Sequence, residues 1–296
     1  MTYRSILAAN CFQDKTILVT GGGSGIGRCT AHELASLGAC VVIIGRNEEK
    51  LKTVQAEIVQ DGGICHYQTG DIRDEDRVKQ IVNEVIQNHG DLHGLVNNAG
   101  GQFPSPLLAI NKKGWDAVIA TNLTGGFLMA REVFTQSMSK QGGAIVNIVA
   151  DMWAGMPGMG HSGAARAGMV NFTQTAAYEW GGAGVRVNAV APGWITSSGM
   201  STYPEGFKSV LKNLANAVPL GRMGNEAEVS AVICFLLSEA ATFVSGTTVR
   251  VDGAASQGNT AIYPLQAHNN CPAFDGFHRE VIPDFLVTEP NPKETK

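Results

Sequence analysis

Glycine is concentrated at one point in the chain where a phosphate-binding turn would need it. Residues 20–27 read Thr-Gly-Gly-Gly-Ser-Gly-Ile-Gly, between an apolar, β-branched run at 16–20 and a segment with helical spacing at 25–37. Glycines let the backbone turn tightly and approach a pyrophosphate, and the start of a helix offers N–H donors and a partial positive charge. We therefore expect the phosphates of a dinucleotide to be held by Gly21, Ser24, Gly25, Ile26 and Gly27.

A basic residue follows the second apolar run, at 41–44. A site selective for NAD usually has Asp or Glu there to bind the ribose 2′-hydroxyl. This chain has Gly45 and Arg46 at that point, and no acidic residue before Glu48. The planar, permanently charged guanidinium of Arg46 suits a 2′-phosphate, although a solvated charge at the entry to a helix is the plainer alternative. We expect NADP(H) to be the coenzyme.

A second group of candidate reactive residues lies between residues 151 and 166. Ser162 and Arg166 are four residues apart in a predicted helix, so they share one face. His161 is a candidate acid because imidazole titrates near neutrality, and Asp151 is placed to orient it or a water. Structural roles stay open for all four: a helix start for His161 and Ser162, a loop cap for Asp151 and a salt-bridged cation for Arg166.

The scaffold that must position these residues alternates between strands and helices. Apolar runs predict seven strands, at 16–20, 41–44, 65–68, 92–97, 144–149, 185–190 and 247–251. Helical spacing predicts helices at 25–37, 47–59 with Asn47 as N-cap, 74–88, 114–138, 162–180 and 225–237. This alternation predicts an α/β fold with a single Rossmann-type, doubly wound parallel sheet of about seven strands and helices on both faces.

Composition limits the remaining classes of function. The net charge is −4, which argues against a nucleic-acid partner, and no apolar run reaches the length of a membrane span. The six cysteines are scattered, without a metal-binding spacing, so we expect reduced thiols, no metal site and a cytoplasmic location without a secretory signal. The strand–helix alternation stops near residue 254, which predicts a catalytic domain at 1–254 and an extension at 255–296, packed on the body or on a neighbouring subunit.

Several motifs, in order, resemble the short-chain dehydrogenase/reductase family over residues 15–253. They are the turn at 20–27, an Asp after the third strand, Asn-Asn-Ala-Gly at 97–100, an Asn in the long central helix and Pro-Gly after the sixth strand. The resemblance implies a nicotinamide coenzyme, a catalytic role for Asn122 and a homotetramer paired through the long central helices. It also implies coenzyme contacts from Asp71, Ile72, Asn98, Ala99, Gly100, Arg166, Pro192, Gly193, Ile195 and Thr196.

One motif departs from the family's pattern. The family has a Ser at the exit of the fifth strand and then Tyr-x-x-x-Lys, whereas this chain has Val149 and Ala150, and then Ser162 and Arg166. The string His-Ser-Gly-Ala-Ala-Arg-Ala-Gly at 161–168 resembles the trans-2-enoyl-CoA reductase branch, of the peroxisomal type. It is also similar to bacterial reductases of citronellol-type terpenoid alcohols.

These substitutions affect two reactions differently. Reduction of a ketone makes an alkoxide that needs a good acid, and Ser is a poor one while Arg cannot relay protons. Reduction of a conjugated enoyl thioester places charge on the thioester oxygen, which hydrogen-bond donors can stabilise. We therefore expect reduction of a hydrophobic 2-enoyl thioester, with an acyl-CoA as candidate substrate. A reductase of hydrophobic carbonyls and a non-catalytic coenzyme-binding subunit are the alternatives.

Loops at the expected substrate end carry apolar side chains. We expect walls at 101–109 and 153–159, the second with Trp153, Met156, Met159 and the preceding Met152, and a lid at 199–219 with Tyr203 and Phe207. Lys208, Lys212 and Arg222 are either contacts for acyl-CoA phosphates or solvated surface charges.

Overall fold

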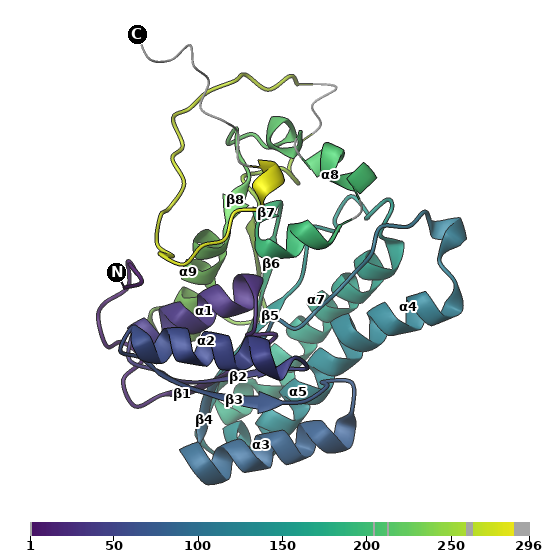
Figure 1. Ribbon diagram of the computed structural model, residues 1–296. Coiled ribbons are helices and arrows are strands. Elements are labelled where there is room, and N and C mark those ends of the chain that lie inside the picture. Colours follow the sequence, from purple (N-terminus) through teal and green to yellow (C-terminus); the bar gives the residue numbers. More distant parts are fainter. Residues whose placement is uncertain (1, 204, 212, 259–262, 287–296) are drawn as a thin grey trace.

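Seven parallel strands form one sheet in the computed structural model, which describes residues 2–203, 205–211, 213–258 and 263–286 (Figure 1). Their order is β3-β2-β1-β4-β5-β6-β9, so the chain winds outward from β1 in one direction and then in the other. Such a reversal opens a crevice at the carboxyl ends of the strands. The predicted Rossmann-type fold is confirmed. The strands are β1 (Thr16–Thr20), β2 (Cys40–Gly45), β3 (Ile64–Thr69), β4 (Leu92–Asn97), β5 (Gly143–Ile148), β6 (Val185–Pro192) and β9 (Thr248–Val251).

Helices cover both faces of the sheet (Figure 1). One face packs against α1 (Gly25–Ser36), α2 (Glu48–Gln60) and α9 (Glu226–Leu237), and the other against α3 (Glu75–His89), α5 (Gly125–Val133) and α7 (Gly160–Trp180). Successive strand residues point to opposite faces. In β1, Ile17 and Val19 accordingly belong to one core cluster and Leu18 to the other.

Polar side chains begin the outer helices as the sequence predicts. Asn47 accepts a hydrogen bond from the main-chain N–H of Lys50 and so caps α2, and Asp74 caps α3 in the same way. Asn225 and Glu228 form a reciprocal capping box at the start of α9.

The long central helix is wound differently from the prediction. Residues 112–141 comprise α4 (Lys112–Ile119), a π-helical turn η2 (Ala120–Thr124), α5, a second π-helical turn η3 (Phe134–Met138) and α6 (Ser139–Gln141). The predicted extent, 114–138, is close, but the two wide turns are absent from an α-helical reading of the sequence. Turns of this kind are frequent at functional sites, and η2 carries Asn122.

Short elements and the C-terminal segment lie outside this frame. Two strands, β7 (Ile195–Thr196) and β8 (Gly224–Asn225), pair with each other, and α8 (Glu205–Leu211) lies between them in sequence. The described part of the C-terminal segment runs beside α1 and α9 (Figure 1). Its Phe277 is buried against Tyr3, and its Arg279 forms an ion pair with Asp61 at 2.8 Å. The domain boundary at residue 254 stays a prediction.

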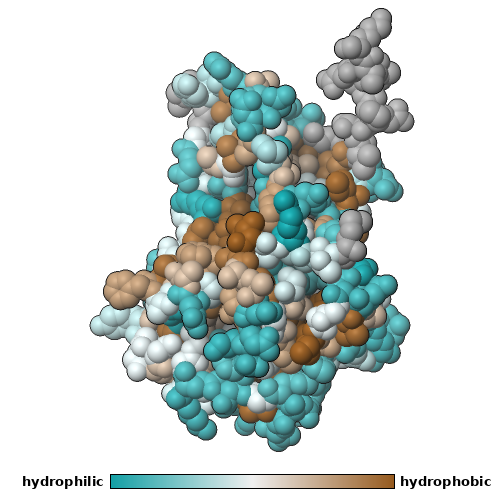
Figure 2. Space-filling model, turned by 90° about the vertical axis from the view of Figure 1, so that its left-hand side faces the viewer, coloured by the Kyte–Doolittle hydropathy of each residue, from teal (hydrophilic) through white to brown (hydrophobic). Residues whose placement is uncertain are grey.

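The exterior is mixed in character. On the face shown in Figure 2, hydrophilic residues dominate the lower half, and apolar residues gather at mid-height. Among the residues that the structure describes, no helix combines the length and the apolar character needed to cross a bilayer.

Candidate active site

The glycine-rich turn after β1 is held in a conformation that requires glycine. Gly21 has a φ of +67°, and a Cβ added there would lie 2.9 Å from the Cα of Ala99. A Cβ on Gly27 would lie 2.5 Å from the carbonyl oxygen of Gly21. The turn therefore packs against both the loop after β4 and the first turn of α1, and a larger side chain would push these three segments apart.

Thr20 and Asn98 join the turn to the loop after β4. The Thr20 hydroxyl accepts hydrogen bonds from the main-chain N–H groups of Asn98 and Ala99, at 3.0 and 2.9 Å. The Asn98 side chain donates to the carbonyl oxygen of Thr20 at 3.0 Å. These bonds fix the two loops whose residues form the centre of the crevice.

A first cavity of about 400 Å³ lies over the carboxyl ends of β1, β2 and β3. Two basic residues at its edge, Lys50 and Arg73, were not among the sequence candidates, because each lies within a charged stretch that is typical of a solvated surface. Gly25 and Gly27 shape the turn without lining the cavity. The sequence candidates that line it are Gly21, Ser24, Ile26, Arg46, Asp71, Ile72, Asn98, Ala99 and Gly100.

The far end of this cavity is basic. Arg73 pairs with Asp71 at 2.5 Å, and its hydrogen bonds hold the pKa of that carboxyl below its usual value. Arg46 is exposed at the rim, and its charge lowers the pKa of Asp71 further. With Lys50, three cationic side chains surround the one carboxylate that lines the cavity, so this end attracts an anion.

A second cavity, also of about 400 Å³, adjoins the first and shares four lining residues with it, Ile26, Asn98, Gly100 and Ser197. It lies over the ends of β4, β5 and β6, below residues of the predicted lid such as Met200, Tyr203 and Leu211. Thr196 does not line it but pairs with Asn225 in the small sheet. Besides the shared Ile26, Asn98 and Gly100, the sequence candidates that line this second cavity are Arg166, Pro192, Gly193 and Ile195.

Arg166 is the cationic side chain of the second cavity. Its Nη1 donates to the main-chain oxygen of Ile148 at 2.6 Å, and a Cβ on Gly100 would lie 2.6 Å from its Nη2. Its Nε is buried without a hydrogen-bond partner among the described residues, where no carboxylate pairs with the guanidinium either. Burial lowers the pKa of Arg166 to about 10, so the side chain remains charged at neutral pH.

Ser162 lies one helical turn before Arg166 and is connected to the lid. Its buried hydroxyl donates to the Gln102 side-chain oxygen at 2.6 Å, and Gln102 Nε2 donates to the Tyr203 hydroxyl at 3.3 Å. Gln102 and Tyr203 both line the second cavity, whereas Ser162 does not. The helix start therefore reaches the cavity only through the Gln102 amide.

The other catalytic candidates do not line either cavity. His161 is fully buried, with its ring edge-on to Phe103 and its Nδ1 accepting from the main-chain N–H of Ser162. Its Nε2 is buried without a partner among the described residues. Asn122 exchanges two hydrogen bonds with the Gly101 main chain, at 2.8 and 2.9 Å, and so fixes the cavity wall from behind. Asp151 lies half-buried in the loop before α7.

Comparison with known proteins decides the family. A model described as enoyl-(acyl carrier protein) reductase matches residues 21–256. The curated "Probable 2,4-dienoyl-CoA reductase" of Bacillus subtilis (strain 168) is 36% identical over 81% of this chain and 96% of its own. A 3-oxoacyl-[acyl-carrier-protein] reductase of Thermotoga maritima is 34% identical over 81% and 97%. The chain belongs to the short-chain dehydrogenase/reductase family.

A solved structure within this family is more similar still. The citronellol catabolism dehydrogenase of Pseudomonas aeruginosa PAO1 is 60% identical, with a TM-score of 0.78 over 86% of this chain and all of that one. Short-chain dehydrogenases/reductases bind a nicotinamide coenzyme, and the glycine cradle at Gly21 and the unpartnered Arg166 Nε fit such a group. The chain is accordingly an oxidoreductase that acts on a small-molecule substrate.

The predicted substrate loops contribute unequally in this short-chain dehydrogenase/reductase. The segment 152–159 does not line either cavity, and its Trp153 stacks with the Arg250 guanidinium, 3.8 Å from the ring centroid. Arg222 pairs with Glu228 and donates to the carbonyl oxygen of Cys271, which makes it a structural cation. Lys208 pairs with Glu205. Lys212 and the side chain of Phe207 lie outside what the structure describes.

Proposed function

We propose that this chain is an NADP(H)-dependent reductase of an activated C=C bond, with a hydrophobic 2-enoyl thioester as substrate. One observation carries the proposal. Arg166, the cationic side chain that lines the second cavity, has an N–H without a partner among the described residues, whereas Val149 and Ala150 at the exit of β5 provide no hydroxyl. This arrangement suits a reaction that makes an oxyanion and does not need a strong acid at that oxygen.

The chemistry follows from where charge develops. The coenzyme, when bound, supplies a hydride, which forms the new C–H bond at the β-carbon of the enoyl group. The π electrons then move to the thioester oxygen, and the Arg166 guanidinium and the Gln102 amide, which both line the cavity, are the donors that we assign to it. Preorganised donors aimed at a developing oxyanion contribute about 3–4 kcal/mol each. A proton from water or a side chain then completes the α-carbon, which gives the saturated thioester.

The other candidates have positioning roles in this proposal. Asn122 holds the Gly101 main chain, and Ser162 orients Gln102. His161 supports Phe103 and fixes the start of α7 through Ser162. We assign to Asp151, in the loop before α7, the orientation of a water molecule.

The preference for NADP(H) rests on the basic end of the first cavity. Arg46 carries no partner carboxylate among the described residues, and Lys50 lies one helical turn further on. The Asp71 carboxylate is already paired, because it accepts a hydrogen bond from the Arg73 guanidinium. A 2′-phosphate would be attracted by all three cations, whereas a 2′-hydroxyl would find its usual acidic partner missing.

The hydrophobic character of the substrate is supported by the second cavity's wall. Ile195, Met200 and Leu211 line it, together with Trp194 and Tyr203 from the loop after β6. Two relatives carry names that refer to reduction of acyl-CoA or acyl-carrier-protein substrates. An acyl thioester combines an apolar chain with the conjugated carbonyl that the proposed chemistry requires.

The position of a transferred isotope tests the proposal directly. Deuterium-labelled NADPH should place one deuterium on the β-carbon of a saturated acyl thioester, as seen by NMR. Deuterium on the hydroxyl-bearing carbon of an alcohol product, with no deuterium transferred to an enoyl thioester, would overturn it.

A second candidate function is the interconversion of a hydrophobic alcohol and its carbonyl. Two observations favour it: the 60% identity to a citronellol catabolism dehydrogenase, and the phenol of Tyr203 on the cavity wall. A phenol is a far better proton donor than an aliphatic hydroxyl. In this alternative, Tyr203 would supply the acid that Ser162 cannot.

We also propose a cytoplasmic homotetramer. Large apolar side chains are exposed on the helices that the family uses for pairing, with Phe127 on α5 38% exposed and Tyr178 on α7 91% exposed. A monomeric mass in solution at micromolar concentration would contradict this assembly.

A further inference from the structure

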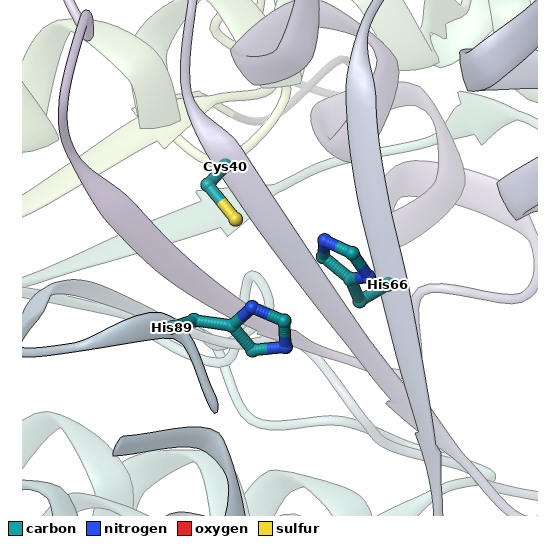
Figure 3. A group of neighbouring side chains, drawn as sticks. All are labelled: Cys40, His66 and His89. Carbon is teal, nitrogen blue, oxygen red and sulfur yellow. The ribbon is translucent and has the colours of Figure 1, made fainter. Parts of the chain in front are cut away.

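Three potential metal ligands from distant parts of the sequence meet at the edge of the sheet. Cys40 begins β2, His66 lies in β3 and His89 ends α3. Their side chains point toward one another (Figure 3), and one ligand atom from each lies within 4.8 Å of the others. The register of β2 and β3 explains why Cys40 and His66 are neighbours, since Cys40 pairs with Ile64 and the next residue of β3 on the same face is His66.

This cluster is separate from the coenzyme crevice. Cys40 opens β2, whereas Arg46 and the first cavity follow the other end of that strand. None of the three residues lines either cavity of the candidate active site. A role for the cluster is therefore independent of the hydride chemistry.

The two imidazoles stack against each other instead of forming hydrogen bonds with other described residues. Their rings stack at 4.2 Å between centroids, with an angle of 27° between planes. Within the described ranges, neither ring nitrogen of His66 or His89 has a protein partner, and the Cys40 thiol has none. All three side chains are half-buried, so these polar groups have lost part of their hydration without replacement. A shared ion would satisfy all three.

The ligand set specifies the class of ion. One thiolate and two imidazoles suit a borderline-soft divalent transition metal, above all Zn²⁺, and a half-exposed site leaves the fourth position to water. Tetrahedral Zn²⁺ with these ligands places the ligand atoms about 3.3–3.6 Å apart. To reach this spacing, the ligand atoms must move closer together by about 1 Å, and rotation of the imidazoles about their soft χ2 torsions can provide that movement.

We propose that Cys40, His66 and His89 form a zinc-binding site that ties the end of α3 to the β2–β3 edge of the sheet. Binding breaks the S–H bond of Cys40 and releases that proton to solvent, with no change in oxidation state. Burial, and secondarily the neighbouring His66, lower the pKa of His89, which keeps its lone pair available at neutral pH. Burial also raises the pKa of the Cys40 thiol, so the metal must displace a proton there.

Cobalt provides a spectroscopic test on the intact protein without coenzyme or substrate. We expect Co²⁺, titrated into fully reduced protein, to produce a thiolate-to-metal charge-transfer band and the intense visible bands of tetrahedral coordination, saturating at one equivalent. Zn²⁺ should then displace it and raise the midpoint of thermal unfolding. Absence of these bands at saturating cobalt, or weak octahedral bands alone, would overturn the proposal.

Single substitutions identify the ligands. Cys40→Ser should abolish the charge-transfer band, and His66→Gln and His89→Gln should each weaken binding at least tenfold. The matched controls are Cys11→Ser, also half-buried, and His268→Gln, whose exposed imidazole lies far along the chain. A band that survives in Cys40→Ser and is lost in Cys11→Ser would place the ion elsewhere and contradict the assignment. Circular dichroism of each variant, compared with the parent, separates loss of ligand from loss of fold.

Discussion

Arg166 Nη1 donates a hydrogen bond to the main-chain oxygen of Ile148 at 2.6 Å, and this bond joins α7 to the end of β5. It also fixes the guanidinium beside Gly100, where Arg166 lines the second cavity. Because this hydrogen bond to the main chain fixes the guanidinium, the side chain does not turn away to pair with a carboxylate. Its positive charge is therefore available to a ligand in the cavity.

Replacing this cation tests its role in binding. Arg166→Met should raise the dissociation constant of NADPH at least tenfold and lower turnover further, because the coenzyme contact and the oxyanion stabilisation that we propose both depend on the guanidinium. Arg166→Lys should restore part of the binding, since it keeps the charge but not the planar fork. Fluorescence titration of NADPH measures the first effect. The control Arg131→Met removes a surface guanidinium from α5; equal losses in both variants would contradict the assignment.

Coenzyme selectivity should depend on Arg46. We expect Arg46→Asp to lower kcat/KM for NADPH about a hundredfold, equivalent to about 2.7 kcal/mol, and to raise kcat/KM for NADH. The new carboxylate repels a 2′-phosphate and accepts a hydrogen bond from a 2′-hydroxyl. Lys52→Ala, an exposed change on α2, the helix that follows Arg46, serves as control. An unchanged ratio of the two coenzymes in Arg46→Asp would show that another residue selects the coenzyme.

A substitution at Tyr203 distinguishes between the two candidate reactions. If a carbonyl is the substrate, Tyr203→Phe should lower kcat a hundredfold or more, since general acid catalysis contributes about 10²–10⁴-fold. If an enoyl thioester is the substrate, the same change should cost less than tenfold, because the phenol then serves only as a wall and as an acceptor for Gln102. Steady-state rates of the variant with both substrates measure the difference. A large loss on the enoyl thioester would make Tyr203 part of its chemistry and contradict our scheme.

The sequence predicts the frame of this molecule better than its contacts. The runs at 16–20 and 92–97 coincide with β1 and β4, since buried parallel strands are continuous apolar segments. Asn47 and Asp74 begin helices because their side chains cap main-chain N–H groups locally. These signals lie within a few residues of one another, so no tertiary information is needed to detect them.

Long-range contacts are the part that the sequence does not reveal. The position of Ser162 was predictable from motif spacing, but its hydrogen bond to Gln102 depends on how the loop after β4 folds over α7. Trp153 was expected in the substrate wall, yet a cation–π contact with Arg250 holds it outside. The wide helical turn at Asn122 is likewise absent from a reading of the sequence by helical spacing alone.

The stability of the fold should depend on Glu226. This carboxyl is 2% exposed, and burial raises its pKa from 4.5 to about 7. Between those pH values the folded protein keeps a proton that the unfolded chain has released. The contribution to stability is therefore fully present below about pH 4.5 and is lost as the pH rises through about 7.

Glu226→Gln removes that dependence. The variant should be more stable than the parent by up to about 3 kcal/mol at pH 8 and should lose this advantage by pH 5, as measured by urea unfolding. Glu239→Gln, at an exposed position, should show neither effect. A variant that is less stable than the parent at pH 8 would mean that the charged form of Glu226 is favoured in the folded state.

The most direct test of the central claim compares two substrates under one set of conditions. Oxidation of NADPH would be followed with a medium-chain trans-2-enoyl-CoA and, in parallel, with a hydrophobic aldehyde such as citronellal. Our account predicts a kcat/KM at least a hundredfold higher for the enoyl thioester, with the saturated acyl-CoA as product. Efficient turnover of the aldehyde, with no consumption of the enoyl thioester, would contradict it.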